Sequence, residues 1–193
     1  MLGSSGEFTG LTKQEKHDFF KFYADYTAGR TKLYAGTGSL NFEDTVALSN
    51  EVNEMGYEGA MVIGPCYYAL DQEKIFVYYD TLAKSIKGNL YIYNFPARSG
   101  HSIAPETLKK LVENNTNIKG LKDSVSEPNH TNELMPLYDM DSNFSLLFKK
   151  LMQHRGVEVL DRAIFPYNQM DEEVYKKAES LMDKVIEEYQ NLK

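Results

Sequence analysis

The chain has 193 residues, 42% of them hydrophobic, and a formal net charge of −7. It can form one domain with its own core, but it is shorter than the roughly 250 residues of a closed eight-stranded α/β barrel. The acidic excess argues against a nucleic-acid partner, and no stretch approaches the roughly 18 apolar residues of a membrane-spanning helix.

The chain contains one cysteine, Cys66, which cannot form a disulfide within the chain. The first residues lack the basic segment and apolar run of a secretory signal. Both features favour a reducing cytoplasm as the location. We therefore expect the partner to be a small molecule or another protein.

Short apolar segments alternate with segments of helical length over the first two thirds of the chain. The first helix is expected to begin after Thr12, whose capping-box partner is Glu15, and to end near Gly29. The elements expected after it are a strand at 32–35, a helix at 41–55, a strand at 59–63, a helix at 71–85, a strand at 89–93, a helix at 105–112 and a strand at 118–121.

Strands that recur about every 30 residues predict an α/β fold with a parallel sheet. The spacing fits an open doubly wound sheet nearly as well as a barrel. After Lys122 the alternation stops, and the segments typical of helices are 128–138, 143–154 and 171–192, with strand-like residues only at 157–160. We predict a partial (β/α) barrel over residues 1–138 and a helical region over residues 139–193.

Five short motifs follow the expected strands. In chain order they are Gly3-Ser4-Ser5-Gly6-Glu7, Ala35-Gly36-Thr37-Gly38-Ser39, Pro65-Cys66-Tyr67-Tyr68, Tyr93-Asn94-Phe95-Pro96-Ala97-Arg98-Ser99-Gly100 and Ile118-Lys119-Gly120-Leu121-Lys122-Asp123-Ser124. In this order and spacing they resemble the strand ends of the dihydrodipicolinate synthase and N-acetylneuraminate lyase family.

The resemblance implies a (β/α)8 TIM barrel that is incomplete in this chain. The second to sixth strands are recognisable, the second by its end alone, whereas the first, seventh and eighth are missing from the match. Residues 151–193 resemble the C-terminal helical appendage of the family.

The same resemblance implies a lyase or aldolase that joins pyruvate, or another 2-keto acid, to an aldehyde or releases it. Lys122 resembles the lysine that forms the covalent imine, so no cofactor is expected. No metal is expected either, because the 4 histidines lack metal-ligand spacing. Burial inside an apolar barrel favours the uncharged amine that attacks a carbonyl, whereas an incomplete wall leaves Lys122 wetter and more often charged.

Further site residues follow from the resemblance. Tyr93 resembles the tyrosine that shuttles protons, and Ser4 and Ser5 resemble the hydroxyl residues that hold the pyruvyl carboxylate. Ser5 also relays protons between Tyr93 and a tyrosine from a neighbouring subunit, which Tyr67 matches, so the active form is expected to be a homo-oligomer. Arg98 resembles the arginine that binds the carboxylate of the second substrate.

Two questions stay open at this point. Arg98 favours a synthase, but Lys122-Asp123-Ser124-Val125 is closer to the 2-keto-3-deoxy sugar acid aldolases. The alternatives to an active enzyme are an inactive remnant that assembles with a full-length relative, using unpaired strand edges, and a chain that folds poorly.

Overall fold

The computed structural model describes residues 1–124, 150–151, 153–154 and 171–191. The chain divides into two compact units, Met1–Gly3 with Leu11–Val125 and Ser4–Gly10 with Ser126–Lys193. We describe the two units separately.

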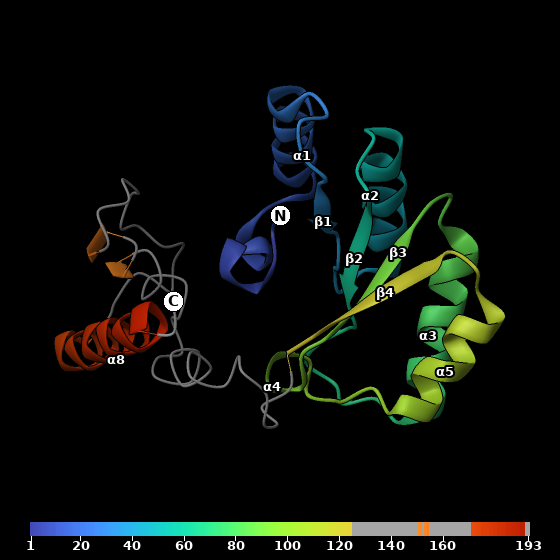
Figure 1. Cartoon of the computed structure of the whole chain (residues 1–193). Helices are drawn as coiled ribbons and strands as arrows, with labels where there is room; N and C mark the ends of the chain where they lie inside the picture. Colours follow the sequence, from blue (N-terminus) through green and yellow to red (C-terminus); the bar gives the residue numbers. More distant parts are fainter. Residues whose placement is uncertain (125–149, 152, 155–170, 192–193) are drawn as a thin grey trace. The chain divides into compact units, whose positions relative to one another are not determined.

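The first unit is built on a parallel four-stranded sheet in the order β1-β2-β3-β4. The strands are β1 (Tyr34–Gly36), β2 (Gly59–Ile63), β3 (Leu90–Asn94) and β4 (Ile118–Asp123). The helices are α1 (Lys13–Thr27), α2 (Phe42–Glu54), α3 (Gln72–Ser85), α4 (Pro96–Ser99) and α5 (Pro105–Asn114). Figure 1 shows α3 and α5 side by side along one side of the sheet. Strands that pair strictly in chain order are typical of a barrel segment, whereas a doubly wound sheet reverses its order.

The expected helix starts are confirmed, because each depends on a local cap. Thr12 and Glu15 form the capping box of α1. Asn41 and Asp71 each accept a hydrogen bond from a backbone N–H in the first turn of α2 and α3. Pro105 occupies the first turn of α5, where its missing N–H costs nothing.

The two faces of the sheet are covered to different extents. The face on which the helices pack, the helix face, carries side chains that are all 0% exposed: Ala35, Ala60, Val62, Leu90 and Ile92. The opposite face, called here the interior face, carries the side chains of Tyr34, Met61, Ile63, Tyr91 and Tyr93, most of them only half-buried. In a closed barrel this second face is filled by side chains from all strands. Four strands therefore leave it partly open.

Met1 extends the sheet beyond β1. Its α-amino group donates to the carbonyl oxygen of Tyr34, and its carbonyl oxygen accepts from the Gly36 N–H at 2.7 Å. The two segments are so close that a Cβ on Gly36 would lie 2.2 Å from the Leu2 carbonyl oxygen, so only glycine fits. The end of the second barrel strand is thus present beside β1.

Several details differ from the sequence prediction. The first strand lies at Tyr34–Gly36 rather than 32–35, and the short helix α4 and two 3₁₀ helices, η1 (Ser4–Gly6) and η2 (Phe8–Gly10), were not expected. The predicted boundary between residues 138 and 139, the predicted helix at 128–138 and the strand-like segment at 157–160 lie outside the described residues.

The second unit contains the C-terminal helix α8 (Glu172–Asn191), which confirms the helix expected at 171–192. Ala178 packs with Leu151 in a small apolar cluster, and both side chains are 0% exposed. Tyr175, Leu181 and Met182 surround this pair. Among the described side chains of α8, the apolar ones around Ala178 therefore pack within their own unit.

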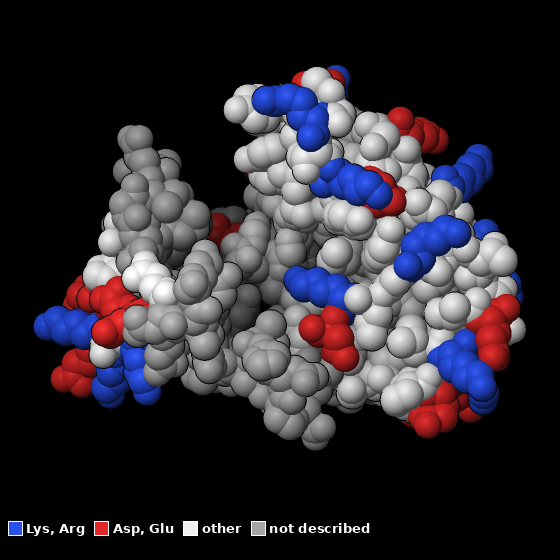
Figure 2. Space-filling model, in the orientation of Figure 1, with Lys and Arg blue, Asp and Glu red and all other residues white. Residues whose placement is uncertain are grey.

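Charged side chains of both signs are interspersed on the face of the molecule shown in Figure 2. Ion pairs join side chains one turn apart on helices, as Lys21 with Asp25 and Lys84 with Asp80. Such surface pairs contribute little to stability, but they keep charge of one sign from accumulating. Among the described residues, no helix combines the length and apolarity needed to cross a membrane.

Candidate active site

The carboxyl ends of β1 to β4 lie at one edge of the sheet, because all four strands run parallel. Parallel α/β sheets and barrels form their ligand sites at this edge. Tyr93 and Lys122 reach it on neighbouring strands, as direct register partners. The next pair along the ladder is Asn94 and Asp123.

The amine of Lys122 lies over the ring of Tyr93, with Nζ 3.7 Å from the ring centroid. The Tyr93 side chain is buried, at 6% exposure. A cation at this distance is attracted to the negative face of the ring, which favours this position of the amine. The sheet therefore brings the predicted nucleophile and the predicted proton shuttle together.

An irregularity in the ladder between β3 and β4 decides which way Lys122 points. The register shifts by one residue directly after Leu90, so Lys119 is an extra residue on β4 that the ladder skips. In an unbroken ladder Lys122 would pair with Asn94 and its side chain would lie on the helix face, because side chains alternate along a strand. The bulge instead places Lys122 opposite Tyr93 on the interior face.

Lys122 is exposed, so the buried amine expected of a complete barrel is wrong for this chain. The physical reason is that β4 is the outer strand of the described sheet, and no further described strand covers it. The wetter lysine expected of an incomplete wall is what the described residues show. Gly3 does approach the amine, since a Cβ on Gly3 would lie 3.9 Å from Nζ of Lys122.

Ser4 and Ser5 follow Gly3 in the helix η1 and belong to the second unit. Ser5 is exposed and Ser4 is half-buried. Their carboxylate-binding role stays a prediction.

Tyr67 stands out in the segment after β2. Its side chain is 85% exposed, and its backbone φ is +88°, which tyrosine rarely adopts. The ring meets that of Tyr68 edge to face at 4.8 Å. Strained backbone of this kind tends to occur at functional positions. The predicted insertion of Tyr67 into a neighbouring subunit stays a prediction.

Arg98 lies in α4 rather than in a loop, and its guanidinium carbon is 6.0 Å from the ring centroid of Phe95. Pro96 begins this helix, and Gly100 ends it in the left-handed conformation at φ +79°. Proline at the start and glycine at the end are the signals that could have predicted α4 from the sequence. The role of Arg98 in binding a carboxylate stays a prediction.

Sequence reasoning did not single out Asn94, which is buried at 4% exposure directly after Tyr93. Its amide nitrogen donates to the Asp123 carboxylate at 3.0 Å. A polar residue at the last position of a buried strand was the available signal.

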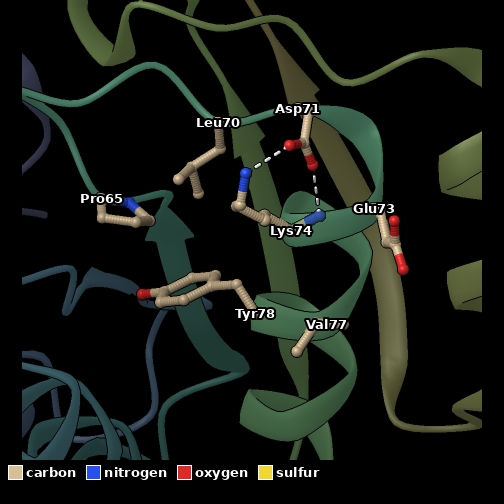
Figure 3. Close-up of a pocket in the computed structure, with 7 residues that line it drawn as sticks. All are labelled: Pro65, Leu70, Asp71, Glu73, Lys74, Val77 and Tyr78. Carbon is tan, nitrogen blue, oxygen red and sulfur yellow. Dashed lines mark hydrogen bonds and ion pairs between the residues drawn. The ribbon is translucent and has the colours of Figure 1, made fainter.

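An open hollow of about 620 Å³ lies elsewhere on this unit, at the N-terminal end of α3 (Figure 3). Pro65, Leu70 and Val77 form part of its wall, and Asp71 and Lys74 are paired with each other. Burial raises the pKa of Tyr78, which also lines it, to about 12. The hollow contains none of the predicted site residues, so we place the candidate site at the strand ends.

His101 is a buried histidine near this edge of the sheet, at 9% exposure, and a Cβ on Gly64 would lie 3.0 Å from its Nε2. Burial lowers the pKa of His101, and a hydrogen bond with the backbone of Ser99 opposes the change. In the unfolded chain the histidine pKa is near 6.5. The stability linked to His101 is therefore present above about pH 6.5 and is lost as the pH falls toward the lower folded-state value.

We accordingly expect the urea concentration at the midpoint of unfolding to be lower at about pH 5.5 than at about pH 7.5. This difference is expected to be smaller in His101→Gln. His17→Gln is the matched control, because His17 is half-exposed and pairs with Glu51 at 2.8 Å. An equal pH dependence in wild type and His101→Gln would contradict the assignment.

Known proteins can now be compared with this geometry. The sequence model of the dihydrodipicolinate synthetase family matches residues 1–147. The chain belongs to this family. A 4-hydroxy-tetrahydrodipicolinate synthase from Kosmotoga olearia is 34% identical over 137 residues, which cover 71% of this chain and 46% of that protein. YagE of Escherichia coli K12, named as a candidate 2-dehydro-3-deoxy-D-gluconate aldolase, is 31% identical over 134 residues, which cover 69% of this chain and 44% of YagE.

Solved structures of the dihydrodipicolinate synthetase family have the same fold. The crystal structure of YagE in complex with pyruvate gives a TM-score of 0.82 at 21% identity, covering 95% of this chain and 85% of that one. A 2-keto 3-deoxygluconate aldolase from Picrophilus torridus gives 0.60 at 32% identity, covering 72% and 49%. The fold class is that of the TIM barrels, and the chain spans about half the length of the curated relatives it matches.

Proposed function

We propose that this chain carries the imine-forming site of a pyruvate-dependent lyase, with Lys122 as the nucleophile and Tyr93 as the proton shuttle. The observation that carries the proposal is the register pairing of these two residues at the strand ends, with Nζ 3.7 Å from the ring centroid, in a member of this family. Assisted imine formation requires an amine that reaches the keto carbon and a proton donor that reaches the oxygen on that carbon.

In the proposed reaction, the uncharged amine of Lys122 attacks the keto carbon of pyruvate and forms a C–N bond. Tyr93 delivers a proton to the carbinolamine oxygen, which leaves as water, and the imine remains. The Tyr93 phenolate left by this transfer accepts a methyl proton, which gives an enamine that attacks an aldehyde carbon, and the reverse sequence breaks the same C–C bond. Because the imine itself accepts the electron pair, no cofactor is required.

The remaining site residues are proposed for binding. Ser4 and Ser5 hold the pyruvyl carboxylate, which is supported by the family motif in which they stand and by the match of the family model to residues 1–147. Arg98 binds a carboxylate on the second substrate through its planar fork. Tyr67, exposed and strained, completes the proton relay of another copy, so the active form is at least a dimer.

We propose a 2-keto acid and an aldehyde as substrates and the cytoplasm as the location. Arg98 favours the aldehyde that a dihydrodipicolinate-type synthase condenses with pyruvate. The sequence after Lys122 favours the aldehyde that a 2-keto-3-deoxy sugar acid aldolase joins to pyruvate or releases. Named relatives of both kinds match this chain.

The proposal is tested by trapping the imine. The chain is incubated with pyruvate and sodium borohydride, digested, and analysed by peptide mass spectrometry. A pyruvate-dependent reduced adduct is expected on the peptide that contains Lys122. An adduct confined to other lysines would remove the assignment of Lys122, and the absence of any adduct would remove the proposed function.

A second candidate function is that of an inactive assembly partner for a complete family member. It is favoured by the exposure of Lys122 and by the sheet edge at β4, where no further described strand pairs. If this candidate holds, adduct formation is absent but the chain co-elutes with a complete relative in size-exclusion chromatography.

Even an active chain is expected to be slow. A misplacement of about 1 Å can cost about 100-fold in rate, and the exposed Lys122 is less firmly positioned than a lysine enclosed by a complete barrel. We expect adduct formation at least about 100-fold slower than in a complete family member assayed in parallel. A monomer that unfolds cooperatively and reacts at the rate of the complete barrel would contradict this expectation.

A further inference from the structure

Asn94 links three segments at the end of the sheet. Its side-chain oxygen accepts from the Ile103 N–H at 3.1 Å, and its side-chain nitrogen donates to the Asp123 carboxylate at 3.0 Å. Its backbone carbonyl accepts from the Ser124 N–H at 2.9 Å. A buried amide that uses both of its ends fixes the segments it joins, because any shift leaves a polar group unpaired.

Asn94 and Asp123 are not placed to touch a substrate held between Lys122 and Tyr93. Side chains alternate along a strand, so the neighbours of Tyr93 and Lys122 in sequence project from the opposite face. Any effect of Asn94 on the chemistry must therefore pass through the backbone of β3 and β4.

The bulge at Lys119 explains how the hydrogen bond from Asn94 to Asp123 affects the register of β4. If Lys119 were paired instead of skipped, the unbroken ladder would place Lys122 opposite Asn94, on the helix face. The two registers differ by one residue, and the hydrogen bond from Asn94 to Asp123 is available only in the observed one. The hydrogen bond from Asn94 to Asp123 therefore fixes the register of β4, at the end of the ladder away from the bulge.

We propose that Asn94 is a positioning residue that holds β4 in the bulged register, and that its hydrogen bond to Asp123 keeps the amine of Lys122 over Tyr93. The inference rests on the proposed function for its role in catalysis, but the placement of Lys122 that it explains is independent of any reaction.

The test is a reciprocal exchange of donor and acceptor. In Asn94→Asp two carboxylates face each other and the donor is lost. In the double variant Asn94→Asp/Asp123→Asn, the new carboxylate accepts from Ile103 and from the new amide, so the bond is restored with its direction reversed. Asp123→Asn completes the cycle. Asp123→Ala removes the acceptor at an exposed position that folding tolerates. This variant replaces Asn94→Asp in the test if Asn94→Asp does not fold.

Two readouts are measured on variants that unfold cooperatively. The first is the rate of pyruvate adduct formation at Lys122, expected to fall on the order of 10- to 100-fold in Asn94→Asp and Asp123→Ala. The double variant is expected to recover to within about threefold of wild type, which a loss of general stability would not predict. The second is the ratio of acetic anhydride labelling at Lys122 to that at Lys119, which is expected to change and recover in the same pattern.

The outcomes separate the two proposals. If wild type forms no adduct, the proposed function fails, and the labelling ratio alone decides the role of Asn94. The inference would be overturned if Asn94→Asp or Asp123→Ala kept the wild-type adduct rate and labelling ratio. It would also be overturned if the double variant were as impaired as Asn94→Asp.

Discussion

Replacing Lys122 by arginine is expected to reduce the pyruvate adduct trapped by borohydride to background. Arginine keeps a positive charge that can stay over the Tyr93 ring, so the fold is preserved, but its guanidinium does not lose a proton near neutral pH and cannot attack the carbonyl. The measurement is the yield of adduct by intact mass, with the modified peptide identified after digestion.

Lys119→Arg is the matched control, because Lys119 is an exposed lysine on the same strand that the β3–β4 ladder skips. Its adduct yield is expected to equal that of wild type. An adduct that persists in Lys122→Arg would show that another lysine reacts, and the assignment of the nucleophile would then be abandoned.

Replacing Tyr93 by phenylalanine is expected to slow imine formation by roughly 10²- to 10⁴-fold, the usual cost of losing a positioned acid-base group. The ring remains, so its contact with Phe95 at 5.7 Å and its place under the Lys122 amine can persist. The measurement is the initial rate of adduct formation at saturating pyruvate, together with urea unfolding to confirm that the variant is folded.

Tyr91→Phe provides the comparison, because Tyr91 lies two positions earlier on the interior face and packs edge to face on Tyr34 at 5.0 Å. It is expected to react at the wild-type rate. If Tyr93→Phe unfolds while Tyr91→Phe does not, Tyr93 serves the core rather than proton transfer.

The elements that could be predicted from the sequence are those that depend on neighbouring residues. The capping box of Thr12 and Glu15 and the caps at Asn41 and Asp71 identify helix starts, since each is satisfied within three residues. The strand Gly59–Ile63 was predicted with its observed bounds because it is a short apolar run between turn residues.

The features that escaped prediction depend on partners far away in the chain. The segment from Ile118 to Lys122 has the same composition in either register, so its pattern could not reveal that Lys119 is skipped. The hydrogen bonds of Asn94 likewise depend on Ile103 and Asp123, which the pattern around Tyr93 does not reveal. These features can be recognised only once the pairing of the strands is known.

The bulge at Lys119 also determines which changes in chain length β4 can accept. Deleting Lys119 would remove the extra residue and leave an unbroken ladder in which Lys122 still pairs with Tyr93 and Asp123 with Asn94. A one-residue insertion between Gly120 and Lys122 would instead place Lys122 opposite Asn94, on the helix face, unless the ladder skipped a second residue. When the strand is aligned across the family, one-residue insertions between the bulge and the lysine should be absent from active members, whereas a deletion at the bulge and changes of residue type at Lys119 should be tolerated.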